Sequence, residues 1–199
     1  MQFTTAAKLL AEFLGTAMIV AGVIGAGFMV ATVGAGFALG LTMIAATVAA
    51  VLFVSISILG PVSGAHFNPA VTIAFLLRKA ISSAAAAGYI ASQVVGAISG
   101  AVLANLMFEV PWLEISATGR FSAGTFLGEV VATLGLVLLI LLLVKFEKSH
   151  LIAASVAVWI FAGHIFTSST SFANPAVTIG RIFSDSPSSI SPDSALWFV

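Results

Sequence analysis

The sequence predicts an all-α integral membrane protein, built as an inverted repeat of transmembrane helices with two re-entrant half-helices. Its composition is the first sign: of 199 residues, 60% are hydrophobic and 7% are charged, whereas a soluble protein needs far more charge to cover its surface. Apolar stretches of membrane-spanning length are the second sign. The third is a hexapeptide, Asn68–Ile73, which recurs letter for letter as Asn174–Ile179. Such an identity between two halves of a chain indicates an internal repeat.

The apolar stretches predict five full spans, since crossing a bilayer takes about 20 residues of helix. The first stretch is too long for a signal-peptide core and has no clear small-residue cleavage site, so we interpret it as a true span. In the third, Gly96 and Gly100 have the spacing that lets helix backbones approach closely. The expected spans are Ala6–Val30, Gly36–Leu59, Ser82–Phe108, Ala123–Phe146 and Leu151–Phe166.

Each copy of the hexapeptide predicts the start of a short helix, because Asn is a preferred N-cap and Pro suits the first helical position. The first short helix, Pro69–Leu77, has about half the length of a span. It follows a Gly/Pro/Ser-rich stretch, 60–67, that ends the second span. The second short helix follows a Ser/Thr run, 167–171, and ends near Arg181.

A polar loop, Glu109–Arg120, marks the boundary between the repeats. We expect a first repeat at 1–109, a connecting outer loop at 110–122 and a second repeat at 123–199. The second repeat has one span fewer than the first, and Ser191–Val199 resembles the beginning of a sixth span. We therefore expect the natural protein to extend by about 20–30 residues, enough for that span and a short tail.

The charges predict a cytoplasmic N-terminus, because basic residues concentrate in cytoplasmic loops. Arg120 and Arg181 then lie outside, and the cytoplasmic cations are Lys8, Arg78, Lys79, Lys145 and Lys148. Three spans separate the two short helices, so these helices enter from opposite faces and their N-termini meet near the midplane. Non-helical backbone at that depth must be packed in protein or line a watery cavity. The sequence thus predicts a central polar site.

At this point a family resemblance is plain. Ser63–Thr72, together with Asn174–Ala176, resembles the paired signature of the aquaporin/aquaglyceroporin (major intrinsic protein) family, and the spacing of motifs and spans matches over all 199 residues. The resemblance implies a passive channel for small uncharged solutes, with no enzymatic activity, cofactor or metal. It also implies a homotetramer in a bacterial inner membrane. The net charge is zero, so the sequence has no excess of basic residues for binding nucleic acid.

The two motifs are the expected pore centre. The carboxamides of Asn68 and Asn174 offer N–H donors where two positive helix ends meet, so a passing water or polyol oxygen accepts from them. The same positive potential opposes protons and cations. The resemblance implies the same arrangement, with Pro69, Ala70, Pro175 and Ala176 completing the two motifs.

Two acids and one histidine have expected supporting roles. Glu12 and Glu129 are the only acids deep in spans, where a charge is costly. We expect each carboxylate to accept hydrogen bonds from backbone N–H groups of a re-entrant loop rather than to contact solute. His66 lies two residues before Asn68, and we interpret it as a pore-lining residue because no second metal ligand is nearby in sequence.

The expected selectivity filter departs from the family pattern. In most members an Arg directly follows the second Asn-Pro-Ala, whereas here Val177 does. The loss of Arg implies a wider and more apolar aperture. By the same resemblance Val48 and Ser171 occupy two further filter positions, and His164 occupies the fourth, with Ala162 as the alternative because the loop is about two residues shorter than usual.

One cation beyond the motif leaves two interpretations open. Arg181 is one helical turn past Val177 and either leans toward the outer vestibule or, as we favour, pairs with Asp185 at the outer surface.

The substrate is also open at this level. The Val177 substitution resembles bacterial aquaglyceroporins of arsenic-resistance operons, which conduct arsenous acid and related neutral species. An ordinary water or glycerol channel is the first alternative. A secondary transporter, which shares inverted repeats and broken helices, is disfavoured because no charged coupling site lies near the motifs.

Overall fold

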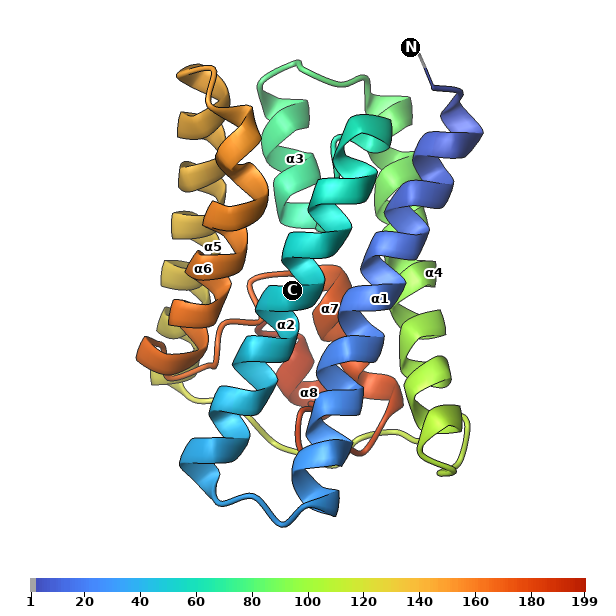
Figure 1. The fold of residues 1–199 in the computed structure, drawn as a ribbon, viewed down its shortest axis with the longest axis vertical. Coiled ribbons are helices and arrows are strands. Elements are labelled where there is room, and N and C mark those ends of the chain that lie inside the picture. The colour runs from blue at the N-terminus through green and yellow to red at the C-terminus, as the bar shows by residue number, and fades with distance from the viewer. Residues whose placement is uncertain (1–2) are drawn as a thin grey trace.

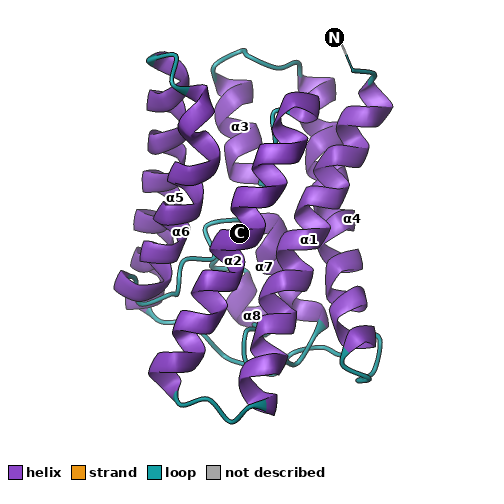
Figure 2. Cartoon of the chain, viewed as in Figure 1, coloured by secondary structure: helices purple, strands orange, loops and turns teal. Residues whose placement is uncertain are grey.

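The computed structural model describes residues 3–199, and in this range the regular structure is entirely helical (Figure 2). Two short 3-10 turns, Ser149–Leu151 and Arg181–Phe183, accompany the α-helices. The α-helices are α1 Thr5–Thr32, α2 Phe37–Ser63, α3 Pro69–Leu77, α4 Ser83–Met107, α5 Ala123–Lys145, α6 Ile152–Phe166, α7 Pro175–Gly180 and α8 Pro192–Ala195. Five segments are long and apolar enough to cross a membrane, which confirms the five predicted spans.

The two short helices occupy opposite halves of the bundle. Figure 1 shows α3 in the upper half and α7 in the lower half, between the long helices. Each begins at an Asn-Pro pair, and the amide of Asn68 bonds to the backbone of Ala173 next to the start of α7. The N-terminal ends of α3 and α7 therefore meet inside the bundle, as expected of two re-entrant half-helices.

Helix α2 continues four residues past its predicted end at Leu59 and includes Pro61. Proline removes one helical hydrogen bond but already has a helical φ, so a single Pro near the C-terminus does not force the helix to end. Gly64, at φ 92°, ends it instead, and its N–H bonds to the carbonyl of Gly60. The end is set by the first glycine that adopts a left-handed cap rather than by the proline.

Helices α1 and α4 pack backbone against backbone. A Cβ at Gly96 would collide with the carbonyl oxygen of Phe13, and a Cβ at Gly100 would collide with that of Ala17. The two glycines therefore allow a close approach that no larger residue permits, as small residues do between membrane helices. This contact fixes α1, which carries Glu12 toward the bundle centre.

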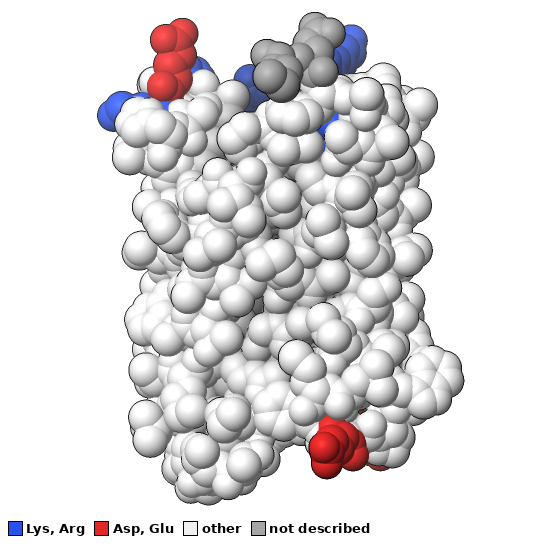
Figure 3. Space-filling model, turned by 45° about the vertical axis from the view of Figure 1, so that its right-hand side comes forward, with Lys and Arg blue, Asp and Glu red and all other residues white. Residues whose placement is uncertain are grey.

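Exposed charged side chains lie at the two ends of the molecule, whereas Glu12 and Glu129 are buried between them. On the face drawn in Figure 3, basic side chains lie at the end where the N-terminus lies, acidic side chains lie at both ends, and an uncharged band separates the two ends. Large apolar side chains are exposed in this band, for example Leu134, Leu138 and Val158. Such a surface suits lipid rather than water. The chain is an integral, multi-pass membrane protein.

We predict that Gly100→Ala destabilises the protein. Alanine is the better helix former, but its methyl group would overlap the Ala17 carbonyl, and overpacking costs about 1–3 kcal/mol. The matched control is Gly119→Ala, since a Cβ at Gly119 meets nothing within 4 Å. Thermal unfolding of the detergent-solubilised variants measures the difference. A melting temperature for Gly100→Ala equal to or above that of the control would contradict the prediction.

Candidate functional site

The loops that lead into α3 and α7 share one unusual backbone conformation. In both loops the residues four, three and one positions before the motif Asn are left-handed, with positive φ. They are Gly64, Ala65 and Phe67, at φ 92°, 50° and 49°, and Thr170, Ser171 and Ala173, at φ 62°, 50° and 48°. A non-glycine residue in this region costs about 1–3 kcal/mol. Five such residues at the centre of one molecule need strong external support.

Glu12 supports the first loop. From α1, its Oε1 accepts a hydrogen bond from the backbone N–H of His66 at 3.0 Å, and its Oε2 accepts one from Phe67 at 2.7 Å. The Ser63 hydroxyl also donates to Oε1, at 2.6 Å, and the Gln93 amide donates to Oε2, at 2.8 Å. Four donors thus surround a fully buried carboxylate, so it is satisfied without contacting solute.

Glu129 supports the second loop in the same way. From α5, its Oε1 accepts from the Phe172 N–H at 2.9 Å, and its Oε2 accepts from the Ala173 N–H at 2.8 Å. These are the residues two and one before Asn174, as His66 and Phe67 are before Asn68. The two carboxylates therefore hold equivalent positions of the two loops.

Each motif Asn caps its own helix. The Asn68 carboxamide oxygen accepts from the Ala70 N–H at 2.9 Å, and that of Asn174 accepts from the Ala176 N–H at 3.0 Å. This is the ordinary N-cap bond, and the proline at the next position has no N–H that needs a partner.

Each carboxamide also ties the two loops together. The Asn68 Nδ2 donates to the Ala173 carbonyl at 2.7 Å, and the Asn174 Nδ2 donates to the Phe67 carbonyl at 2.8 Å. Every NH₂ group has two donor hydrogens, and each of these Nδ2 atoms has one hydrogen-bond acceptor among residues 3–199. One N–H of each carboxamide is left for a solute at the junction of the two half-helices.

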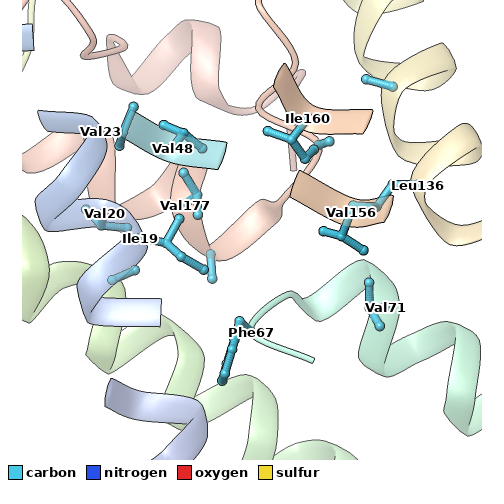
Figure 4. Close-up of a cluster of buried hydrophobic side chains, with 14 of the residues drawn as sticks. Ile19, Val20, Val23, Val48, Phe67, Val71, Leu136, Val156, Ile160 and Val177 are labelled. Atoms are coloured by element: carbon cyan, nitrogen blue, oxygen red, sulfur yellow. The ribbon is translucent and has the colours of Figure 1, made fainter. Parts of the chain in front are cut away.

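A cavity of about 620 Å³ runs past these asparagines. Part of its lining is built from aliphatic side chains of the long helices, which converge on the centre in Figure 4. This part includes Ile19, Val23, Val48, Leu136, Val156 and Ile160. The two loops also line the cavity, with the carboxamides of Asn68 and Asn174 and the loop backbone. The lining of the cavity is therefore partly aliphatic and partly polar.

The structure places the four expected filter residues on this cavity. Val48, His164, Ser171 and Val177 all line it, whereas Ala162 does not. His164 is buried, and its Nδ1 lies 2.8 Å from the Ile160 carbonyl oxygen. Because a carbonyl only accepts, Nδ1 carries the hydrogen and Nε2 is an acceptor.

His66 also lines the cavity. Its Nδ1 lies 3.1 Å from the Thr72 hydroxyl, and its ring contacts those of Phe75 and Tyr89. Within residues 3–199 no group of three His, Asp or Glu side chains is arranged to hold a metal ion. The histidine is therefore fixed by a hydroxyl and two aromatic rings.

The favoured interpretation of Arg181 is wrong. Arg181 is buried, its Nε donates to the Ser188 carbonyl, and its Cζ lies 3.5 Å from the centre of the Phe172 ring. Asp185 instead accepts from the Ser116 hydroxyl at 3.2 Å. The 3-10 turn after α7 directs Arg181 inward, where stacking on an aromatic face offsets part of the cost of burial.

A second cavity, of about 160 Å³, lies outside the first, between the α1–α2 end of the bundle and the loop around Ser188. His164 and Arg181 line both cavities. Arg120 lines only the outer one. Burial lowers the pKa of the Arg120 guanidinium, but an arginine keeps its charge in proteins.

Sequence reasoning missed two participants. Gln93 on α4 bridges the Glu12 carboxylate and the Thr72 hydroxyl, at 2.8 and 3.0 Å. A buried amide in an apolar span was the available signal. Phe172 carries the Arg181 guanidinium, and nothing in the sequence marked it, because its position depends on the left-handed loop around it.

The family follows from a comparison with known proteins. The sequence profile of the family described as Major intrinsic protein matches residues 1–186. The chain belongs to this family. Aquaglyceroporin AqpS of Rhizobium meliloti (strain 1021) is 41% identical over 198 residues, covering 100% of this chain and 84% of its own length. As a member of the major intrinsic proteins, the chain is a membrane channel and not an enzyme.

Other major intrinsic proteins are similar in part or in fold. Glycerol uptake facilitator protein-like 6 of Lactiplantibacillus plantarum is 47% identical over 92 residues, 46% of this chain and 39% of that protein. The X-ray structure of the aquaglyceroporin from Plasmodium falciparum superposes with a TM-score of 0.75 at 24% identity, covering 89% of this chain and 79% of that one. The latter likeness concerns the fold.

We predict that Glu129→Gln destabilises the protein by about 1.5–3 kcal/mol, because the amide has one acceptor oxygen for two buried N–H groups. Glu114→Gln, at an exposed loop position, is the control and should leave stability unchanged. Thermal unfolding and monodispersity in detergent measure both. If Glu129→Gln matched the control, the carboxylate would not be what supports the loop.

Proposed function

We propose that this chain is a passive channel for small uncharged solutes that carry hydroxyl groups: water, glycerol, arsenous acid and related neutral arsenicals. The observation that carries the proposal is the partly aliphatic and partly polar cavity at the meeting point of the two half-helices. A polyol has a carbon skeleton that suits the aliphatic part of the lining and hydroxyls that suit the polar part. A pore for water alone needs no such combination.

The two motifs supply the central contact. A solute oxygen accepts from the remaining N–H of Asn68 and of Asn174, while neighbouring carbonyls accept from its hydroxyls. Pro69 and Ala70, like Pro175 and Ala176, fix the helix starts behind the two asparagines. Two positive helix ends at one point repel cations and protons, while neutral solutes pass.

We take the filter to be wide because Val177 stands where the family pattern described above has Arg. Val177 borders the large cavity together with Val48, Ser171 and His164, and none of these residues reaches as far as a guanidinium. The similarity to a protein named aquaglyceroporin supports solutes larger than water. Uptake of arsenous acid distinguishes this proposal from an ordinary water or glycerol channel.

The setting of the channel is part of the proposal. A bacterial relative supports the inner membrane, and the basic loops at the N-terminal end support a cytoplasmic N-terminus. We also propose a homotetramer, with repeats at 1–109 and 123–199 joined by an outer loop at 110–122.

The transporter alternative makes an opposite prediction. We expect neutral-solute flux to follow the solute gradient and to be insensitive to membrane potential and proton gradient. The reason is that no Asp or Glu of the described residues lines the central cavity, so no acidic coupling site is present there. Vesicle uptake with and without imposed proton and sodium gradients measures this. Accumulation against the solute gradient would favour a secondary transporter.

The selectivity prediction concerns Val177→Arg. The guanidinium would project into the cavity that Val177 lines and add fixed donors. We expect glycerol and arsenous acid uptake to fall by about tenfold, equivalent to about 1.4 kcal/mol in the barrier, while water flux persists. Val177→Leu, which adds volume without charge, is the matched control and should reduce uptake less. Equal uptake by wild type and a correctly folded Arg variant would remove Val177 from the filter.

A further inference from the structure

We infer that Arg181 supplies the fixed charge and the hydrogen-bond donors of the outer constriction, and that with His164 it forms a donor–acceptor pair that admits hydroxylated neutral solutes and rejects cations. The inference rests on the proposed pore. It assigns the charge of the filter to a residue four positions beyond Val177, one helical turn farther along the chain.

The position of Arg181 between two cavities is the first argument. The inner cavity, of about 620 Å³, and the outer one, of about 160 Å³, have two lining residues in common, His164 and Arg181. Val48, Ser171 and Val177 line the inner cavity only. His164 and Arg181 therefore border both spaces, and a solute that moves from one space to the other at this point passes these two side chains.

The way Arg181 is held is the second argument. Its guanidinium stacks on the Phe172 ring and its Nε donates to the Ser188 carbonyl. The Phe172 backbone is itself held by the Glu129 carboxylate at 2.9 Å. Loop, ring and guanidinium thus form a rigid series, and such an Arg is presented to the passage in one orientation.

The charge of Arg181 is not neutralised by an ion pair. Its two Nη groups have no hydrogen-bond acceptor among the described residues, and no carboxylate there forms a salt bridge with it. Glu129 is occupied by the second loop. Arg120 adds a second guanidinium, 5.6 Å from the Phe172 ring centre, tied to the carbonyls of Pro187 and Ser189. The charged residues that line the outer cavity are therefore Arg120 and Arg181, and both are positive.

His164 provides the complementary acceptor. Its Nδ1–H is engaged with the Ile160 carbonyl at 2.8 Å, so Nε2 accepts hydrogen bonds. A hydroxyl group donates and accepts at once, so it can pair with Nε2 and with an Nη–H group of Arg181. A sodium ion has no hydrogen bond to offer the guanidinium and is repelled by its charge.

This arrangement explains how the outer constriction can carry a fixed positive charge while the filter at Val177 stays wide. An Arg at position 177 would project into the large cavity, which Val177 lines. The charge at position 181 stands at the neck between the cavities and leaves the inner filter wide. The channel then excludes cations although the usual filter Arg is missing.

The test compares Arg181→Gln with wild type, using the full-length protein in proteoliposomes. Water flux is followed by light scattering, and sodium leak by a radioactive tracer. We expect water flux to persist and sodium leak to rise by about tenfold. The repulsion between a sodium ion and a nearby unpaired positive charge exceeds the change in barrier that a tenfold change in rate requires. The control is Arg78→Gln, which removes an exposed cation at the C-terminal end of α3 and should not make the channel leak sodium. The double variant Val177→Arg/Arg181→Gln should restore sodium exclusion.

Two further outcomes distinguish a role of the Arg181 charge in selectivity from a purely structural role of this residue. Arg181→Lys keeps the charge but not the planar fork, so it should exclude sodium while changing the ratio of glycerol to water flux. If Arg181→Lys leaks sodium as Arg181→Gln does, or if Arg181→Gln conducts water and still excludes sodium, the inference is overturned while the proposed pore stands. If wild type itself passes neither water nor glycerol down a gradient, the proposed function fails and the inference fails with it.

Discussion

Backbone N–H groups outside a helix have no water to bond to inside a membrane, and this constraint determines how the centre of the channel is built. The two loops before α3 and α7 are left-handed at equivalent positions, and the N–H groups of the two residues before each motif Asn have no acceptor within their own loop. Glu12 and Glu129 accept them instead, each with both carboxylate oxygens. Burying a carboxylate is costly in free energy. Each of these carboxylates accepts backbone hydrogen bonds that its strained loop would otherwise lack, and this offsets the cost.

The remaining features of the passage depend on these two carboxylates. The fixed loops place the asparagines at the helix junction and turn their own backbone toward the cavity. The second loop also fixes Phe172, and through its ring it fixes Arg181. The contact between Glu129 on α5 and the second loop thus also determines the position of Arg181, which lies at the neck between the two cavities. The aliphatic part of the lining needs no such device, because it consists of ordinary side chains of long helices.

The fold could be predicted from the sequence because it rests on hydropathy and on an exact repeat. Each span and each copy of the repeat can be read from a short stretch of sequence. Spans, short helices and the opposite entry of the two motifs all follow from counting. The end of α2 could not be placed, because Pro61 is tolerated and Gly64 makes the turn. Arg181 was misassigned for a deeper reason. Its direction depends on Phe172, which depends on left-handed residues held by Glu129, and no short sequence window contains that chain of contacts.

The reciprocal bonds of the asparagines have a consequence for biogenesis. Asn68 donates to the carbonyl before Asn174, and Asn174 donates to the carbonyl before Asn68. A nascent chain that has inserted only its first half therefore holds an amide and a carbonyl without partners at membrane depth. The first loop reaches its final state only after the second has arrived, so the two halves mature together however early the first is synthesised.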